Sequence, residues 1–430
     1  MTITAFGFVY FVCTAFAYCK SYNAVAYLFA FSYLFQTSAV LVIGDTGFMP
    51  YLFGPVILIM KGLNLKPLND VGVKNIQKMS VAFIAFVIIQ SFVAFLFFDG
   101  SVKVYTGGGM ESALATGKVP FHFSSKQIIQ WLYLVLNMGG LVSLLKHRHY
   151  LPIDFSKNIV LCSIIFALLL GFWKYIADNV GGWFPNDFLF NNASFNLANM
   201  QQIIDGKMRF TSLFTEASVC GAFLSLFWWN IFFMQIERKK ILLVSTFVCL
   251  VLSLASTGFF CMGFGFTLYL LWKRKLKFLC LFILFAIVFY VALQCTGLDE
   301  VFFRMTIYKS SSGSAEARSA IMKSGLDLFK DTYAIGCGLG SSTAAGLATT
   351  LLGQLGLLGI LGFILWLYPV FRFVKKNRKV GMRFCILLCL FGMCISIGYL
   401  SYPIFWMELI IATCSPASGL PKAKKSIIIY

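Results

Sequence analysis

The sequence predicts an all-α polytopic integral membrane protein, and three observations carry this prediction. The 430-residue chain is 59% hydrophobic and only 12% charged, whereas an ordinary soluble domain is about 25% charged. Apolar runs that approach the roughly 20 helical residues needed to cross a bilayer recur along the whole sequence. The basic residues gather in short loops between these runs. We therefore expect a single membrane domain over residues 1–430, with about 12 to 13 transmembrane helices.

The expected helices follow the apolar runs in chain order, and several of the runs are short. They lie at residues 3–19, 24–44, 49–60, 79–98, 126–145, 158–177, 211–235, 241–256, 258–272, 278–295, 345–371, 384–400 and 403–414. Residues 1–19 lack a basic start and a small-residue cleavage site, so the first helix is expected to stay in the protein as an anchor.

The net charge of +19 indicates a membrane topology rather than a nucleic-acid partner. Of the 35 Lys and Arg residues, 24 fall in seven short loops, and only Asp70, Asp154 and Glu237 stand beside them. These loops share one side if the spans alternate, as the positive-inside rule expects of a cytoplasmic face. The opposite side then holds the external loops 99–125, 178–210 and 296–344, and a basic tail at 415–430 is cytoplasmic.

The second half of the last external loop predicts an amphipathic helix on the outer membrane surface. Met322, Leu326 and Phe329 recur at helical spacing, while charged residues fall on another face. Arg318 shares the apolar face, four residues before Met322. A guanidinium that points toward the membrane domain requires an anionic partner there.

Outer basic residues predict a cationic pocket beside the spans that begin near 211 and 345. Arg209 and Arg318 are its candidate catalytic residues, with Arg304 and Lys174 as candidate substrate contacts. Arginine suits a diphosphate because its planar fork donates parallel hydrogen bonds and stays charged. The alternative is that each cation only anchors at the interface or makes a salt bridge, and for Lys174 this alternative is favoured.

Two carboxylates and two glycines complete the candidate site. Glu216 follows Arg209 by nearly two helical turns, so it could act as a general base or as the ion-pair partner of Arg209. Glu316 is a second candidate base. Gly338 and Gly340, in "GCGLGSS", either form a turn between helices or let the backbone approach a ligand.

No metal or cofactor is expected from the motifs of this chain. The sequence has no Cys/His cluster with zinc spacing, no Walker-type phosphate loop and no acidic pair placed for Mg²⁺ on the outer side. The motifs therefore favour neither ATP-driven chemistry nor metal-dependent hydrolysis.

Three motifs, taken in order, resemble the O-antigen polymerase and ligase superfamily of bacterial envelope proteins. They are "RFTSLFTEASVCG", "LSLASTGFF" and "ARSAIMKSGLDLFKDTYAIGCGLG" leading into "LLGQLGLLGILG", and together they cover about residues 200 to 365. The resemblance implies a metal-independent glycosyltransferase of the C class, in which Arg209 and Arg318 bind the diphosphate of a lipid-linked donor.

The resemblance also implies where the protein works and with what. Such enzymes use undecaprenyl-diphosphate-linked oligosaccharides in the bacterial inner membrane, with the active site facing the periplasm. Membrane lipids surround them, and a chain-length regulator and a flippase are candidate partners. Ligases of the family carry a histidine after the "G-x-G" segment, and the corresponding "SSTAAGLATTLLG" has none. This difference favours a Wzy-type polymerase; a ligase, a flippase or transporter of the same lipid, and a noncatalytic scaffold remain the alternatives.

Overall fold

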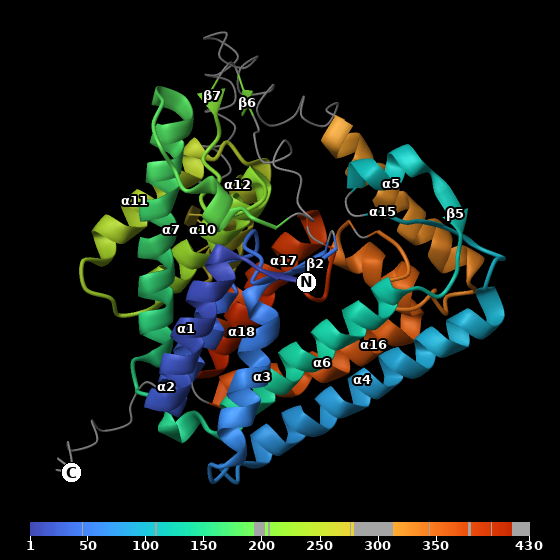
Figure 1. Ribbon diagram of the computed structural model, residues 1–430, viewed down its shortest axis with the longest axis horizontal. Coiled ribbons are helices and arrows are strands. Elements are labelled where there is room, and N and C mark those ends of the chain that lie inside the picture. Colours follow the sequence, from blue (N-terminus) through green and yellow to red (C-terminus); the bar gives the residue numbers. More distant parts are fainter. Residues whose placement is uncertain are drawn as a thin grey trace.

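The structure is a computed structural model that describes residues 1–430 except 45, 108–109, 193–202, 205–206, 276, 279–312, 344, 377–379, 397 and 415–430. It is mostly helical (Figure 1). The helices are α1 (Ala5–Lys20), α2 (Tyr22–Ser32), α3 (Pro50–Leu63), α4 (Val71–Phe98), α5 (Met110–Thr116), α6 (Ser125–Lys146), α7 (Phe155–Val180), α8 (Asn186–Leu189), α10 (Ala217–Phe233), α11 (Lys239–Leu252), α12 (Ser256–Trp272), α15 (Gly313–Asp331), α16 (Leu347–Lys376), α17 (Val380–Ser396) and α18 (Pro403–Cys414).

Long apolar helices confirm that the chain is a multi-pass membrane protein. Within the described residues, four helices are long and apolar enough to cross a bilayer: Val71–Phe98, Ser125–Lys146, Phe155–Val180 and Leu347–Lys375. Six shorter apolar helices accompany them: Ala5–Lys20, Pro50–Leu63, Ala217–Phe233, Ser256–Trp272, Gly381–Ser396 and Pro403–Cys414. The expected span at 278–295 lies almost entirely outside the described residues.

Short strands accompany the helices in three small places. Strands β1 (Thr2–Ile3), β2 (Leu41–Ile43) and β3 (Thr46–Phe48) form one antiparallel sheet, with Thr2 opposite Val42 and Val42 opposite Gly47. Strands β4 (Lys103–Tyr105) and β5 (Lys118–Pro120) form a hairpin, and β6 (Ile203–Ile204) pairs with β7 (Lys207–Met208).

The first of these sheets corrects the helix expected over 24–44. The helix ends at Ser32, and the polar residues Thr37 and Ser38 each donate a side-chain hydrogen bond to the Leu189 carbonyl. These bonds hold the chain in a buried, non-helical path. Gly44, with φ of 58°, then allows the turn into β3. Hydropathy alone does not register this change, because the apolar run continues through it.

Several segments that the sequence assigned to basic loops meet in space. At one end, the Lys61 ammonium donates to the Tyr18 carbonyl at 2.6 Å. There Arg148 also pairs with Asp70 at 2.8 Å and lies 4.7 Å from the centre of the Phe373 ring. These contacts bring together basic loops that are distant in sequence. Among the candidate site residues described below, Glu216 is the N-cap of α10 and Arg209 contacts the carbonyls after α11.

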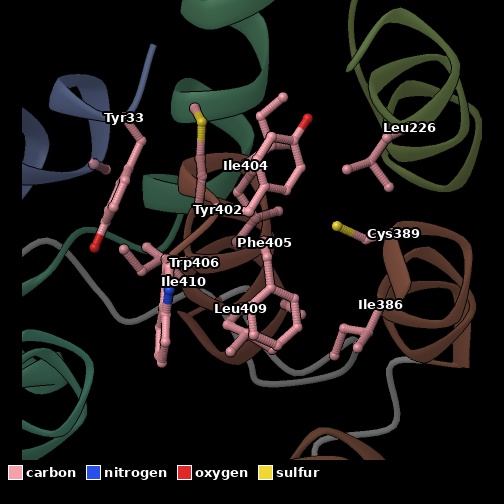
Figure 2. Packing of buried hydrophobic residues seen from close by; sticks show 14 of the residues in the cluster. Tyr33, Leu226, Ile386, Cys389, Tyr402, Ile404, Phe405, Trp406, Leu409 and Ile410 are labelled. Carbon is pink, nitrogen blue, oxygen red and sulfur yellow. The ribbon is translucent and has the colours of Figure 1, made fainter. Parts of the chain in front are cut away.

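The core surrounds the shortest of the late helices, α18. Every residue from Pro403 to Thr413 is buried, although this helix has only 12 residues. Figure 2 shows Trp406 and Ile410 on the side facing Tyr33, while Ile386 and Cys389 lie on the other side. An apolar surface all round is typical of a helix enclosed by others.

Helix α15 forms where a helix was expected in the last external loop, but it buries another face than the sequence indicated. Leu326, assigned to the inward face, is 42% exposed, whereas Ala317, Ile321 and Leu328 are nearly fully buried. The helix packs against α16 and against the β4 and α5 region, so it is covered from two directions (Figure 1). Arg318 stands at the edge of the buried stripe instead of within it.

Glycines set how closely α15 approaches α16. A Cβ atom added to Gly353 of α16 would lie 2.7 Å from the carbonyl oxygen of Gly325 in α15. Close approach of two helix backbones requires small residues at the crossing. The long helix α16 is itself interrupted at Gly356, whose φ of 68° is not helical, so the single span expected over 345–371 consists of two helical pieces.

We expect Gly353→Ala to loosen α15 from α16. The added methyl group meets backbone rather than a flexible side chain, and overpacking of this kind costs about 1 to 3 kcal/mol. The melting temperature in detergent should fall clearly. Gly263→Ala in α12 is the matched control, because nothing lies within 4 Å of a Cβ built there. Equal melting temperatures for both variants would contradict the tight crossing.

Candidate functional site

The first turn of α10 presents a carboxylate to the surface helix. Glu216 occupies the N-cap position with an extended backbone, but its side chain does not cap the helix. Instead its Oε2 atom accepts a hydrogen bond of 2.7 Å from the hydroxyl of Ser218. The carboxylate is therefore held by its own helix and directed away from the helix amides.

Arg318 of α15 meets this carboxylate across 102 residues of sequence. One terminal nitrogen of its guanidinium donates to Glu216 Oε2 at 3.0 Å and lies 3.5 Å from the Ser218 hydroxyl. The side chains of Arg318 and Glu216 are 20% and 31% exposed. The Nε atom of Arg318 is buried and has no hydrogen-bond partner within the described part of the chain. Glu216 is thus the anionic partner that Arg318 was expected to need.

Arg209 differs from Arg318 in being fixed by the backbone. Arg209 is only 4% exposed. Its Nε donates to the Ser253 carbonyl at 2.9 Å, and a terminal nitrogen donates to the Leu254 carbonyl at 2.6 Å. These carbonyls follow the C-terminus of α11, where helix carbonyls lack partners and the helix dipole favours a cation. Arg209 therefore stabilises the turn between α11 and α12.

The charges of Glu216 and Arg318 both influence the pKa of Arg209. Burial lowers the pKa of Arg209 to about 10, the charge of Glu216 opposes this shift, and the positive charge of Arg318 adds to it. At neutral pH the guanidinium remains protonated. The three residues thus form one electrostatic cluster, which we call the Arg209–Glu216–Arg318 cluster.

Three further candidates are Lys174, Glu316 and Arg304. Lys174 is 8% exposed; it forms an ion pair with Asp178 and lies 5.6 Å from the centre of the Phe190 ring. This ion pair within the protein belongs to the alternative that was favoured for Lys174 over contact with a phosphate. Glu316 is exposed in the first turn of α15, and Arg304 falls outside the described residues.

The glycine loop after α15 is engaged within the protein. Gly338 donates its amide to the Gln354 carbonyl at 2.7 Å, and Gly340 donates its amide to the Gln354 side chain at 2.9 Å. Both have φ above 80°, and a Cβ atom on Gly338 would lie 2.9 Å from the Gln127 side chain. These contacts indicate that the two amides serve packing within the protein rather than contact with a ligand.

Sequence reasoning missed Ser218. A serine two residues after an N-cap glutamate has no distinctive pattern, since it matches many helix starts. Its role is visible only because the extended N-cap backbone places its hydroxyl on the carboxylate that Arg318 meets. Among the described residues no group of three His, Cys, Asp or Glu side chains lies close enough together to hold a metal ion.

Part of the chain matches a known protein family. Residues 241–349 match the family model described as O-antigen ligase. The matched segment contains Arg318 and the glycine loop, while Arg209 and Glu216 precede it. None of the curated proteins compared matches the chain. This segment is therefore similar to the O-antigen ligase family, in agreement with the resemblance of the motifs.

Proposed function

We propose that this protein is a polysaccharide polymerase that joins undecaprenyl-diphosphate-linked oligosaccharide repeat units into a longer glycan. The observation that carries the proposal is the Arg209–Glu216–Arg318 cluster at one end of the membrane helices. A part-exposed arginine suits recognition of a diphosphate, and a carboxylate beside it suits acceptance of a hydroxyl proton.

The proposed reaction is a displacement at the anomeric carbon of the donor glycan. The oxygen of an acceptor sugar hydroxyl forms a bond to that carbon, and Glu216 accepts the hydroxyl proton. The bond between the anomeric carbon and the diphosphate oxygen breaks, and undecaprenyl diphosphate leaves with the electron pair. Arg318 contacts the charge that develops on the leaving group, while the buried charge of Arg209 adds a positive potential without direct contact.

The charge distribution supports a periplasmic site. The basic loops at the other end of the bundle are expected in the cytoplasm by the positive-inside rule, so the cluster faces the periplasm of a bacterial inner membrane. Lipid-linked glycans reach such a site laterally within the membrane, and the part-exposed position of Arg318 near the helix ends suits the level of a lipid diphosphate.

Polymerase activity is favoured over ligase activity by the sequence after the glycine loop. Residues Ser341–Gly353 contain no histidine, whereas ligases that this chain resembles carry one there. A second candidate function is transport of the same lipid. The observations that favour it are the interruption of α16 at Gly356 and the fully buried Glu408 of α18, because transporters use broken helices and buried charges within the membrane.

The test uses purified protein and purified lipid-linked repeat units without nucleotide. A polymerase produces a ladder of longer glycans, which gel electrophoresis or mass spectrometry resolves. A ligase extends nothing unless an acceptor such as lipid A core is added. Lipid-linked sugar that crosses liposome bilayers without any extension would contradict the enzyme proposal and support the transporter.

We expect the rate of glycan extension to be unaffected by removal of metal ions. In the proposed reaction Arg209 and Arg318 neutralise the diphosphate, a role that bound cations fill in other phosphate chemistry. Glycan extension should stay within about twofold of its original rate after treatment with a chelator and dialysis. A loss that added Mg²⁺ or Mn²⁺ restores would contradict this part of the mechanism.

A further inference from the structure

Two arginines of the cluster are held in different ways, and the difference points to Arg318 as the one that can change partners. Arg209 is enclosed and donates to two backbone carbonyls. Arg318 is part-exposed, and its ion pair with Glu216 uses one terminal nitrogen. A part-exposed ion pair contributes about 1 kcal/mol or less, so a better anion can replace the carboxylate.

A diphosphate is such an anion. It carries more negative charge than one carboxylate and offers several oxygens to a planar guanidinium. Glu216 uses a single oxygen for the contact with Arg318, and the Nε of Arg318 has no partner within the described residues. Arg318 therefore gains hydrogen bonds if it moves from the carboxylate to a diphosphate.

Ser218 determines what happens to the carboxylate after this move. Its hydroxyl donates to the same Glu216 oxygen at 2.7 Å, and Ser218 is only 5% exposed. Because both residues belong to the start of α10, this bond does not depend on α15. Glu216 would stay oriented without Arg318, and the position on Oε2 that Arg318 now occupies would be open to the proton of an acceptor hydroxyl.

We infer that Arg318 exchanges Glu216 for the donor diphosphate, and that Ser218 is the positioning residue that holds the released carboxylate for proton transfer. This inference rests on the proposed function and deepens it, because it makes donor binding the event that activates the base. The charged and titratable groups facing Glu216 in the described residues are Arg318 from α15 and Arg209 before α10, and the thiol of Cys220 faces Arg209.

The first experiment measures binding of undecaprenyl diphosphate, without a glycan, to the full chain in lipid nanodiscs. Glu216→Gln keeps the side-chain shape and removes the competing charge. We expect it to bind undecaprenyl diphosphate about fivefold more tightly than the original protein, the factor that release of a part-exposed ion pair supplies. The same variant should extend glycans at least about 100-fold more slowly. Unchanged or weaker binding by Glu216→Gln would overturn the exchange.

The second experiment separates the role of Ser218 from a merely structural one. Ser218→Ala should leave undecaprenyl diphosphate binding within about twofold and lower the turnover number by about tenfold. Ser218→Thr retains a hydroxyl and should restore the turnover number. Ser225→Ala is the control, since Ser225 is a fully buried serine of the same helix. A turnover loss in Ser218→Ala that Ser218→Thr does not restore, or that comes with an equal loss of undecaprenyl diphosphate binding, would overturn the positioning role.

These outcomes distinguish the inference from the proposed function. If the original protein neither extends glycans nor binds undecaprenyl diphosphate, the polymerase proposal fails. If it extends glycans but Glu216→Gln does not bind more tightly, only the exchange fails. Size-exclusion profiles and melting temperatures identify variants that do not fold. If Glu216→Gln is one of them, Glu216→Asp replaces it, because the shorter side chain weakens the pair in the same direction.

Discussion

Arg318→Lys is expected to abolish glycan extension while the protein still folds. Lysine keeps the positive charge, but it offers a point charge in place of a planar fork and cannot bind two phosphate oxygens in parallel. Loss of one preorganised contact to a leaving group costs on the order of 100-fold in rate. The measurement is the rate of ladder formation from purified lipid-linked repeat units.

The control for this result is the stability of the variant. Arg318 and Glu216 are part-exposed, so their ion pair contributes little to folding, and the melting temperature should change by no more than a few degrees. Lys323→Arg on the same helix is a matched variant, since Lys323 is exposed and outside the cluster. Full activity of Arg318→Lys would show that the site needs only a positive charge.

Arg209→Ala, unlike Arg318→Lys, should act mainly on the stability of the protein. The substitution leaves the carbonyls of Ser253 and Leu254 without the donors that now serve them. Buried acceptors that lose their partners, together with the cavity left by the side chain, cost about 2 to 4 kcal/mol. The melting temperature in detergent should fall markedly, and the yield of monodisperse protein should fall with it.

The comparison with Arg209→Lys refines this prediction. A lysine can still place one ammonium near the same carbonyls, so Arg209→Lys should retain part of the stability that Arg209→Ala loses. It cannot donate from two separate nitrogens, and the rest of the stability should therefore be lost. An Arg209→Ala variant that melts like the original protein yet has lost activity would contradict the structural role and place Arg209 in direct contact with substrate.

Much of the helical framework could be predicted from the sequence. A bilayer requires apolar segments of a certain length, and it favours positive charge in the loops on the cytoplasmic side. The helix over 126–145, for example, is observed at Ser125–Lys146. The same reasoning did not locate the end of α2 or the break at Gly356. Both occur inside continuous apolar runs, where hydrogen bonds to distant residues and not hydropathy end the helix.

The candidate site shows the same division. Sequence patterns predict that Arg318 belongs to a polar helix and that a cation there needs an anionic partner. The folded chain identifies Glu216 as this partner, Ser218 as the residue that holds the carboxylate, and the turn after α11 as the binding place of Arg209. Most of these contacts join residues many positions apart, because they depend on how the helices pack. Local patterns report the polarity of each helix face but not which helix lies against it.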